Sequence, residues 1–360
     1  MNSKSLQSLI SIGFISSSIH LALGINSIVR ASGFAPLYSN INSYEITISS
    51  SGDITDIYFP ELSNNTNLDS LPIALLLQGS YVDKTRYSQY ASTVASYGFI
   101  VVVPNDVNDV LVPFGFPEGF LSEEEQIIET LDYLKDENLN ANSPLFDLVD
   151  TDNLGLLGHS YGGIVGLNAM TGACNLPYCT STFERPKELK AGVFYGSDYN
   201  QLNIFPEIPP IEHSDIPIAL LSGTLDGLAS PDNIATTYEQ IQQPPKTLIN
   251  VLGANHYGIT NTNNPFGTFP DFNVPTLEQE IAIETIARWS SVFLRANLLD
   301  DEEAIAYLDN TGDLLDTNVT VTSQRSVPEP SAILGLFVFG LMGLKLQLKK
   351  SKNVSTSIGS

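Results

Sequence analysis

The chain alternates between short, wholly apolar runs and segments in which apolar residues recur with helical spacing. Wholly apolar runs of this length are typical of parallel strands that are buried on both faces. Before them, Tyr44–Phe59 alternates with period two around Gly52, which predicts an antiparallel hairpin. We expect buried strands at Leu71–Leu77, Phe99–Val103 (ended by Pro104), Leu154–Leu157, Ala191–Tyr195, Ile216–Leu221 and, as the last strand, Thr247–Leu252.

Helical spacing between these runs predicts the covering layers. Ser122, with Glu125 three residues later, forms a capping box at the start of one helix. Strands that alternate with helices predict one α/β domain, over residues 36–320, with a mostly parallel sheet and helices on both faces. Functional sites of such sheets form at the carboxyl ends of the strands. The expected helices are Ser88–Tyr97, Ser122–Leu134, Ile164–Met170, Ile234–Ile241 and Glu278–Leu294.

One motif carries candidate chemistry. The residues from Gly158 to Gly162 read Gly-His-Ser-Tyr-Gly, between the predicted strand Leu154–Leu157 and the predicted helix Ile164–Met170. In this context the pattern predicts a sharp, strained turn that lifts the hydroxyl of Ser160 above the sheet at the start of a helix. The positive end of that helix favours negative charge as it develops. The motif therefore indicates a nucleophilic serine, the alternative being a tight turn without chemistry.

A serine hydroxyl needs a base, and elimination among the four histidines selects one. His20 lies in the leader region, and His159 adjoins Ser160, so its side chain is expected to point away from the nucleophile. His213 precedes a strand and therefore lies at the wrong edge of the sheet. His256 follows the last predicted strand, at the correct edge, and is the predicted base.

The third member of a triad orients the imidazole. Asp226 lies just past the strand Ile216–Leu221, which gives the chain order Ser, Asp, His that this architecture uses. Asp198, past the preceding strand, is a rival for the same role. The non-catalytic alternative for either aspartate is a structural role, as a loop residue whose side chain hydrogen-bonds its own backbone.

An oxyanion needs two backbone N–H donors. We expect one from Tyr161, directly after the nucleophile, and the other from the loop that follows Leu71–Leu77. In that loop Ser80 is the predicted donor and Tyr81 the alternative.

These blocks together resemble the dienelactone-hydrolase or chlorophyllase-like members of the α/β-hydrolase superfamily, over roughly residues 36–300. Platelet-activating-factor acetylhydrolases and cutinase-like polyesterases share the layout. The resemblance implies hydrolysis of small-molecule or lipid-like carboxylic esters, without a metal or organic cofactor. Related enzymes commonly have His-Gly where this chain has Gln78-Gly79. The matching blocks are Gly98 to Pro104, Gly158 to Gly163, Gly223 to Asp226 and Gly253 to His256.

Two other functions remain open at this point. The departure at Gln78 is compatible with a non-catalytic surface protein that keeps the hydrolase fold for binding. The same three residues could also carry out acyl transfer or peptide cleavage.

Two further segments could shape a substrate pocket. Val112–Phe120 is an apolar loop broken by proline and glycine, suited either to contact an acyl or alkyl group or to pack against the core. Cys174 and Cys179, the two cysteines of the chain, are spaced for a disulfide loop in an oxidising compartment, two free thiols being the alternative.

The overall charge excludes one class of partner. Acidic residues number 40 and basic residues 16, so the net charge is −24. Such a surface repels phosphate backbones, which argues against nucleic-acid binding, and it disfavours docking of the folded domain on anionic membranes.

The two ends indicate export. Lys4 and the mostly apolar stretch Leu9–Ile28 predict a secretory signal peptide over residues 1–31, or an uncleaved anchor. Residues 327–352 combine Val-Pro-Glu-Pro, the apolar run Ala332–Leu344 and a lysine-rich end. This tail resembles the PEP-CTERM sorting signal. The resemblance implies export to the cell surface, periplasm or extracellular matrix, transient membrane retention through a hydrophobic helix, and removal by an exosortase-type enzyme. A plain C-terminal anchor is the alternative.

Overall fold

The computed structural model describes residues 33–62, 70–172, 183–200, 207–213 and 216–325. The predicted signal peptide, the Cys174–Cys179 loop and the tail over residues 327–352 lie outside the described residues and stay predictions. Within the described ranges, no helix combines the length and apolarity needed to cross a bilayer. The chain divides into two units, Met1–Gln324 and Arg325–Ser360, and the fold below belongs to the first.

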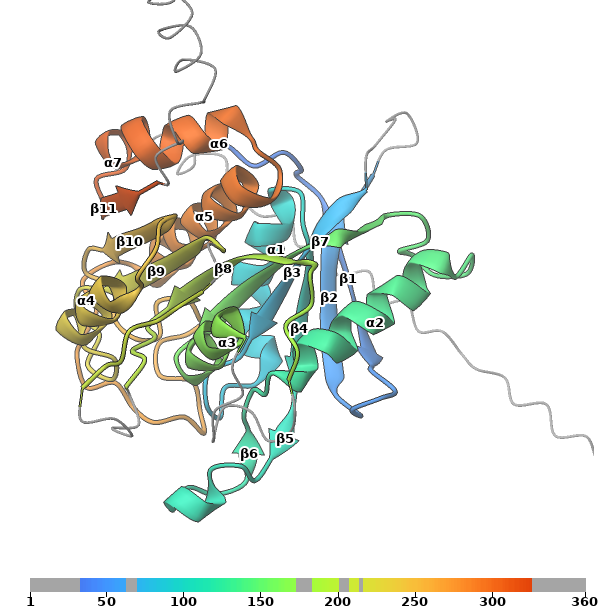
Figure 1. Ribbon diagram of the computed structural model, residues 1–360, viewed down its shortest axis with the longest axis horizontal. Helices are drawn as coiled ribbons and strands as arrows, with labels where there is room; N and C mark the ends of the chain where they lie inside the picture. The colour runs from blue at the N-terminus through green and yellow to red at the C-terminus, as the bar shows by residue number, and fades with distance from the viewer. Residues whose placement is uncertain (1–32, 63–69, 173–182, 201–206, 214–215, 326–360) are drawn as a thin grey trace, which may run out of the picture. The chain divides into compact units, whose positions relative to one another are not determined.

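The described residues form a nine-stranded sheet in the order β1-β2-β4-β3-β7-β8-β9-β10-β11 (Figure 1). From β4 to β10 in this order all neighbouring strands are parallel, whereas the β1–β2 hairpin and β11 join antiparallel at the two edges. The strands are β1 Ile41–Thr47, β2 Ile54–Pro60, β3 Leu71–Leu77, β4 Ile100–Asn105, β7 Val149–His159, β8 Leu189–Tyr195, β9 Ile218–Gly223, β10 Lys246–Val251 and β11 Val319–Gln324.

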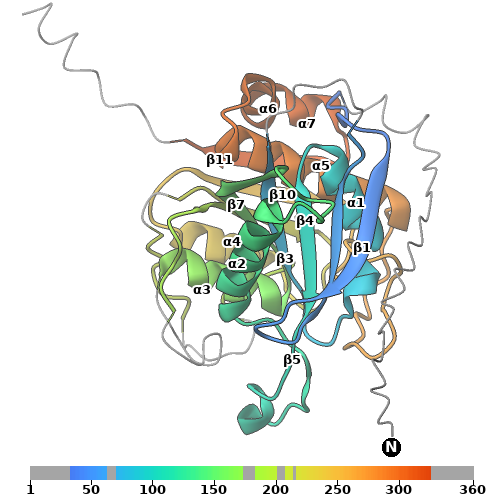
Figure 2. The same ribbon diagram turned by 90° about the vertical axis from the view of Figure 1, so that its right-hand side faces the viewer.

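Helices cover both faces of this sheet, as Figure 2 shows. α1 and α5 pack on one face and α2, α3 and α4 on the other, each side with its own apolar core. The predicted mostly parallel α/β architecture is therefore confirmed. The helices are α1 Ser88–Ser96, α2 Glu125–Leu139, α3 Tyr161–Thr171, α4 Pro231–Gln240, α5 Gln279–Leu298, α6 Glu302–Ala306 and α7 Gly312–Leu315, with shorter helical turns at Lys84–Tyr87, Val112–Phe114 and Tyr307–Thr311.

Three local predictions are wrong. β4 runs through Pro104 to Asn105, because β4 pairs with β3 only as far as Val102 and the proline borders β2 alone. The capping box does not form: α2 begins at Glu125, and the Ser122 hydroxyl donates instead to the carbonyl of Gln78. Nor is β10 the last strand, since β11 follows it at the sheet edge, where alternating burial suffices and no apolar run is needed.

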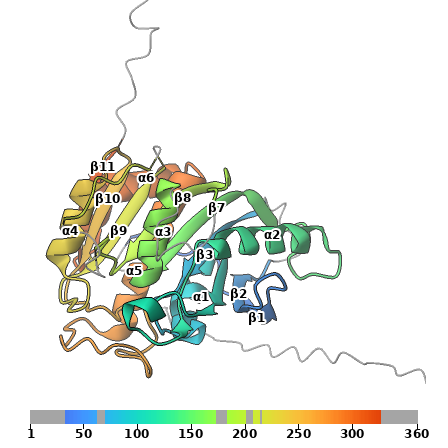
Figure 3. The ribbon, with the colours of Figure 1, turned by 60° about the horizontal axis from the view of Figure 1, so that its bottom comes forward.

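The predicted apolar loop Val112–Phe120 is part of a projecting hairpin. Its ends form a short antiparallel ribbon of β5 Val107–Asn108 and β6 Gly119–Phe120. Figure 3 shows this hairpin on the same side of the sheet as the long loop that joins β10 to α5. Because β3, β7, β9 and β10 all end toward that side, their following loops can meet there.

Candidate active site

Ser160 occupies a strained turn between β7 and α3. Its φ of 52° and ψ of −121° lie outside the regions that most side chains adopt. Glycines make this turn possible: a Cβ at Gly162 would lie 2.3 Å from the carbonyl oxygen of Leu77, and one at Gly163 would lie 1.8 Å from the Ser197 hydroxyl. The strand–turn–helix setting that the motif requires is therefore present, and the hydroxyl stands at the start of α3.

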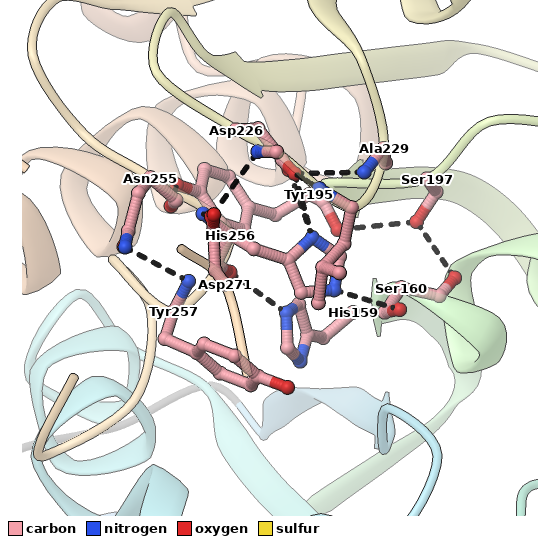
Figure 4. A network of polar contacts seen from close by, with 12 residues as sticks. His159, Ser160, Tyr195, Ser197, Asp226, Ala229, Asn255, His256, Tyr257 and Asp271 are labelled. Carbon is pink, nitrogen blue, oxygen red and sulfur yellow. Dashed lines mark hydrogen bonds and ion pairs between the residues drawn. The ribbon is translucent and has the colours of Figure 1, made fainter. Parts of the chain in front are cut away.

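The structure brings Ser160, His256 and Asp226 together (Figure 4). The Nε2 atom of His256 lies 2.9 Å from the Ser160 hydroxyl, and its Nδ1 lies 2.8 Å from Oδ2 of Asp226. The three residues come from the loops after β7, β9 and β10, and all three are buried. A proton can therefore pass from the hydroxyl to an imidazole that a carboxylate already orients.

Asp226, and not Asp198, is the carboxylate beside His256. Oδ1 of Asp226 also accepts from the backbone N–H groups of Leu228 and Ala229, at 2.9 and 2.7 Å, which holds the carboxylate toward the ring. The carboxylate of Asp198 accepts from the side chain of Asn233, on α4, at 2.8 Å. The two rivals thus face different elements.

A second buried aspartate, Asp271, supports the loops that carry the acid and the base. Its Oδ2 accepts from the backbone N–H of His256 at 3.0 Å and from that of Gly227 at 3.1 Å. Asp271 was not singled out in the sequence, where no motif marks it. Its place next to His256 depends on the β10–α5 loop folding back on itself, which Asn264 fastens by bonding both backbone groups of Asp271.

The other described histidines, His159 and His213, hydrogen-bond groups other than the Ser160 hydroxyl. His213 is buried and its ring nitrogens contact the carbonyls of Ile216 and Gln243, away from Ser160. His20 lies outside the described residues. The ring of His159 is directed away from the Ser160 hydroxyl, as predicted, and toward Tyr87 and the backbone of His256. Complete burial and the neighbouring His256 keep the pKa of His159 well below its usual value, so its ring is neutral.

The loop after β3 borders the same cavity as Ser160. Ser80 and Tyr161, the predicted oxyanion donors, both line it. The backbone N–H of Tyr81 donates to the carbonyl of Phe120 at 2.7 Å, so the alternative donor is already engaged. The side chain of Gln78 is buried, and neither of its amide atoms has a hydrogen-bond partner among the described residues.

The cavity above Ser160 measures about 200 Å³ and is mostly apolar, with several aromatic side chains in its lining. Tyr81, Phe116, Tyr257 and Phe269 line it, and the ring of Phe269 lies edge-on to those of Tyr81 and Phe116, with centroids 5.5 and 6.1 Å apart. Phe116 belongs to the predicted apolar loop, which therefore contributes to the pocket. Phe269, from the β10–α5 loop, was not anticipated.

Nothing in the described ranges is arranged as a metal centre: no three His, Cys, Asp or Glu side chains are grouped so as to hold an ion. The candidate chemistry is carried by the hydroxyl, the imidazole and the carboxylate described above.

Comparison with known proteins now adds to this geometry. A family model described as PETase, PET hydrolase-like, matches residues 38–279, more than half of the chain. A comparison with curated proteins found no match. The matched segment contains Ser160, Asp226 and His256, and it agrees with the α/β-hydrolase fold and with hydrolysis of ester bonds. The chain belongs to the PET hydrolase-like family.

Proposed function

We propose that this protein is a serine hydrolase that cleaves carboxylic esters through an acyl-enzyme, with Ser160 as nucleophile, His256 as base and Asp226 as the residue that orients the base. The observation that carries the proposal is the unbroken contact from the Ser160 hydroxyl through both ring nitrogens of His256 to Asp226, at 2.9 and 2.8 Å. This is the arrangement in which a serine hydroxyl becomes a competent nucleophile at neutral pH.

The reaction has two halves. In the first, His256 takes the proton of Ser160 while the oxygen attacks the ester carbonyl, and the oxyanion accepts hydrogen bonds from the backbone N–H groups of Tyr161 and Ser80. The C–O bond to the leaving alcohol then breaks as His256 returns the proton to that alcohol. In the second, His256 deprotonates a water that attacks the acyl carbon, and Ser160 leaves with the proton.

The pocket favours an apolar, uncharged substrate. Aromatic side chains line the space directly above Ser160, and the net charge of −24 repels anionic ligands. PET hydrolysis is the activity named in the family description, and aromatic side chains in the lining are compatible with an aromatic acyl group. We therefore place the substrate among small-molecule or lipid-like esters with an apolar acyl part, and propose no metal or organic cofactor.

The decisive test is Ser160→Ala. Because no other hydroxyl contacts His256 among the described residues, turnover of a short p-nitrophenyl ester should fall at least about 10⁴-fold. Ser291→Ala is the matched control, since Ser291 is a buried serine of α5 that bonds only its own helix, and it should keep wild-type turnover.

Labelling with a fluorophosphonate separates the catalytic proposal from its rivals. Covalent labelling of the wild type that Ser160→Ala abolishes supports the nucleophile. A wild type that neither reacts with the probe nor turns over any ester would instead favour a non-catalytic binding protein. Product analysis with added alcohol or peptide distinguishes hydrolysis from acyl transfer and peptide cleavage.

A further inference from the structure

A buried chain of hydrogen bonds connects the oxyanion loop to the catalytic base without touching the nucleophile. The hydroxyl of Tyr87 accepts from the backbone N–H of Gly79 at 2.9 Å and lies 2.9 Å from Nδ1 of His159. On the other side of the ring, Nε2 of His159 lies 3.0 Å from the backbone carbonyl of His256. Tyr87 and His159 are both fully buried.

Only one placement of protons satisfies this chain. The carbonyl of His256 can only accept, so Nε2 of His159 carries the ring proton and donates to it. In the neutral ring Nδ1 is then an acceptor, so the Tyr87 hydroxyl donates to Nδ1 and accepts from the backbone N–H of Gly79. A doubly protonated ring would donate from Nδ1 to the Tyr87 oxygen and leave the proton of the Tyr87 hydroxyl without this acceptor. The neutral state of His159, imposed by its burial, is the one that the chain requires.

The hydrogen-bond chain joins the loop after β3 to the loop after β10, which are far apart in the order of the sheet. Gly79 follows β3 and directly precedes Ser80, whereas His256 follows β10, and three strands separate β3 from β10 in the sheet. Direct contact between those strands is therefore impossible, and His159, at the end of β7, lies between them. Gly79 lets the ring approach: a Cβ there would lie 2.7 Å from Nδ1 of His159.

We propose that Tyr87 and His159 are positioning residues, which hold the oxyanion loop and the base at a common distance from Ser160. This inference rests on the proposed function. Neither residue takes part in bond making, because the Tyr87 hydroxyl and both nitrogens of His159 are engaged with each other and with the backbone. Their effect is on geometry, and an oxyanion donor contributes about 10²–10³-fold to turnover only when it is correctly placed.

The chain offers a closely matched pair of variants. Tyr90 lies one turn beyond Tyr87 and is equally buried. Its hydroxyl donates to Ser290 of α5 at 3.0 Å and takes no part in the hydrogen-bond chain from Gly79 to His256. Tyr87→Phe and Tyr90→Phe each remove one buried hydroxyl and keep the ring. Both should lower the melting temperature by a few degrees, because each removes a buried hydrogen bond; Ser290 keeps its bond to the carbonyl of Ile286, whereas Gly79 and His159 both lose the Tyr87 hydroxyl.

Turnover should distinguish the two variants. We expect Tyr87→Phe to lower kcat for a p-nitrophenyl ester about 10- to 100-fold, with KM changed less than threefold, and Tyr90→Phe to keep the wild-type kcat. Titration with a fluorophosphonate counts the competent sites, so that kcat refers to folded enzyme alone. Equal kcat per titrated site in both variants would overturn the proposal.

A second pair keeps the inference testable if Tyr87→Phe folds poorly. His159→Gln retains a neutral side chain with a donating NH₂ group and an accepting carbonyl oxygen, whereas His159→Leu retains neither. If the hydrogen-bond chain positions the base, His159→Gln should keep part of the kcat that His159→Leu loses. Identical losses in the two variants would count against the proposal. The two proposals can fail separately. If the wild type has esterase activity that depends on Ser160 but Tyr87→Phe keeps the wild-type kcat, the positioning role is wrong and the proposed function is unaffected.

Discussion

Two clusters of polar side chains differ in whether all their polar groups are paired within the protein or one of them borders a cavity. On α5, Arg288 donates to the carboxylates of Glu284 and Asp316 and to the hydroxyl of Tyr307, and Trp289 donates to Asp316 as well. We call these five residues the α5 cluster. Each charge in it meets an opposite charge or a polar partner, so the cluster closes on itself.

The active-site cluster, made of Ser160, His256, Asp226, Asp271 and His159, is built otherwise. Several of its members bond loop backbone, as Asp271 does to the N–H groups of His256 and Gly227, and the hydroxyl of Ser160 borders a cavity. Removing one partner from a closed buried cluster destabilises the fold, whereas an open cluster holds a reactive group in place. The two should therefore respond to mutation in different measurements.

The largest effect should come from the acid of the active-site cluster. Asp226→Ala leaves the imidazole of His256 without the carboxylate that orients it, so kcat should fall about 10³- to 10⁴-fold. Asp198→Ala removes a carboxylate of the neighbouring loop that contacts Asn233, and kcat should stay within threefold of the wild type. Steady-state kinetics on a p-nitrophenyl ester decides between them. The reverse order of losses would assign the acid to Asp198.

The α5 cluster should show the opposite behaviour. Asp316→Ala leaves the indole N–H of Trp289 and one edge of Arg288 without an acceptor, although Arg288 keeps Glu284. We expect the free energy of unfolding to fall by about 3 kcal/mol, measured by urea titration. The kcat per fluorophosphonate-titrated site should not change. A drop in kcat as large as that of Asp226→Ala would show that the two clusters are not independent.

The sequence predicts well those features that are written in neighbouring residues. The strand Leu71–Leu77 was predicted at its observed bounds, because a fully buried strand needs an apolar residue at every position. The turn at Ser160 follows from glycines at fixed spacing. His256 could be identified as the candidate base because, of the four histidines, it is the one that follows the last predicted strand at the correct edge of the sheet.

Features that depend on distant partners could not be predicted. Ser122 has the sequence of a helix cap, but its hydroxyl bonds the carbonyl of Gln78, 44 residues away. Asp198 and Asp226 both follow strands, and only the directions of their loops decide which one meets His256. Asp271 and Tyr87 carry no motif at all, because their roles exist only after the β10–α5 loop has brought Asp271 to His256 and the helical turn Lys84–Tyr87 has brought Tyr87 to His159.

Another buried carboxyl, outside both clusters, sharpens the comparison, because one of its oxygens has no hydrogen-bond partner among the described residues. Glu124 is fully buried, accepts a hydrogen bond from Asn168 and makes no ion pair with any described residue. Burial raises the pKa of Glu124 to about 8, against 4.5 for an ordinary glutamate, despite the opposing hydrogen bond from Asn168. The folded protein therefore keeps this proton over a range in which the unfolded chain loses it.

The sign of the pH dependence follows from that difference. Between about pH 4.5 and pH 8 the folded state binds one proton more than the unfolded state at Glu124, so this residue makes stability fall as the pH rises, by at most about 1.4 kcal/mol per pH unit. Glu124→Gln, which resembles the protonated acid, should remove that slope, so its advantage over the wild type should grow between pH 5.5 and pH 7.5. Urea titrations at pH 5.5, 6.5 and 7.5 measure it. Asp136→Asn, at an exposed position of α2, the helix that directly follows Glu124, should show no such trend. A Glu124→Gln difference that stays constant with pH would mean that the folded protein holds Glu124 ionised, and that a buried carboxyl needs no cation to remain charged.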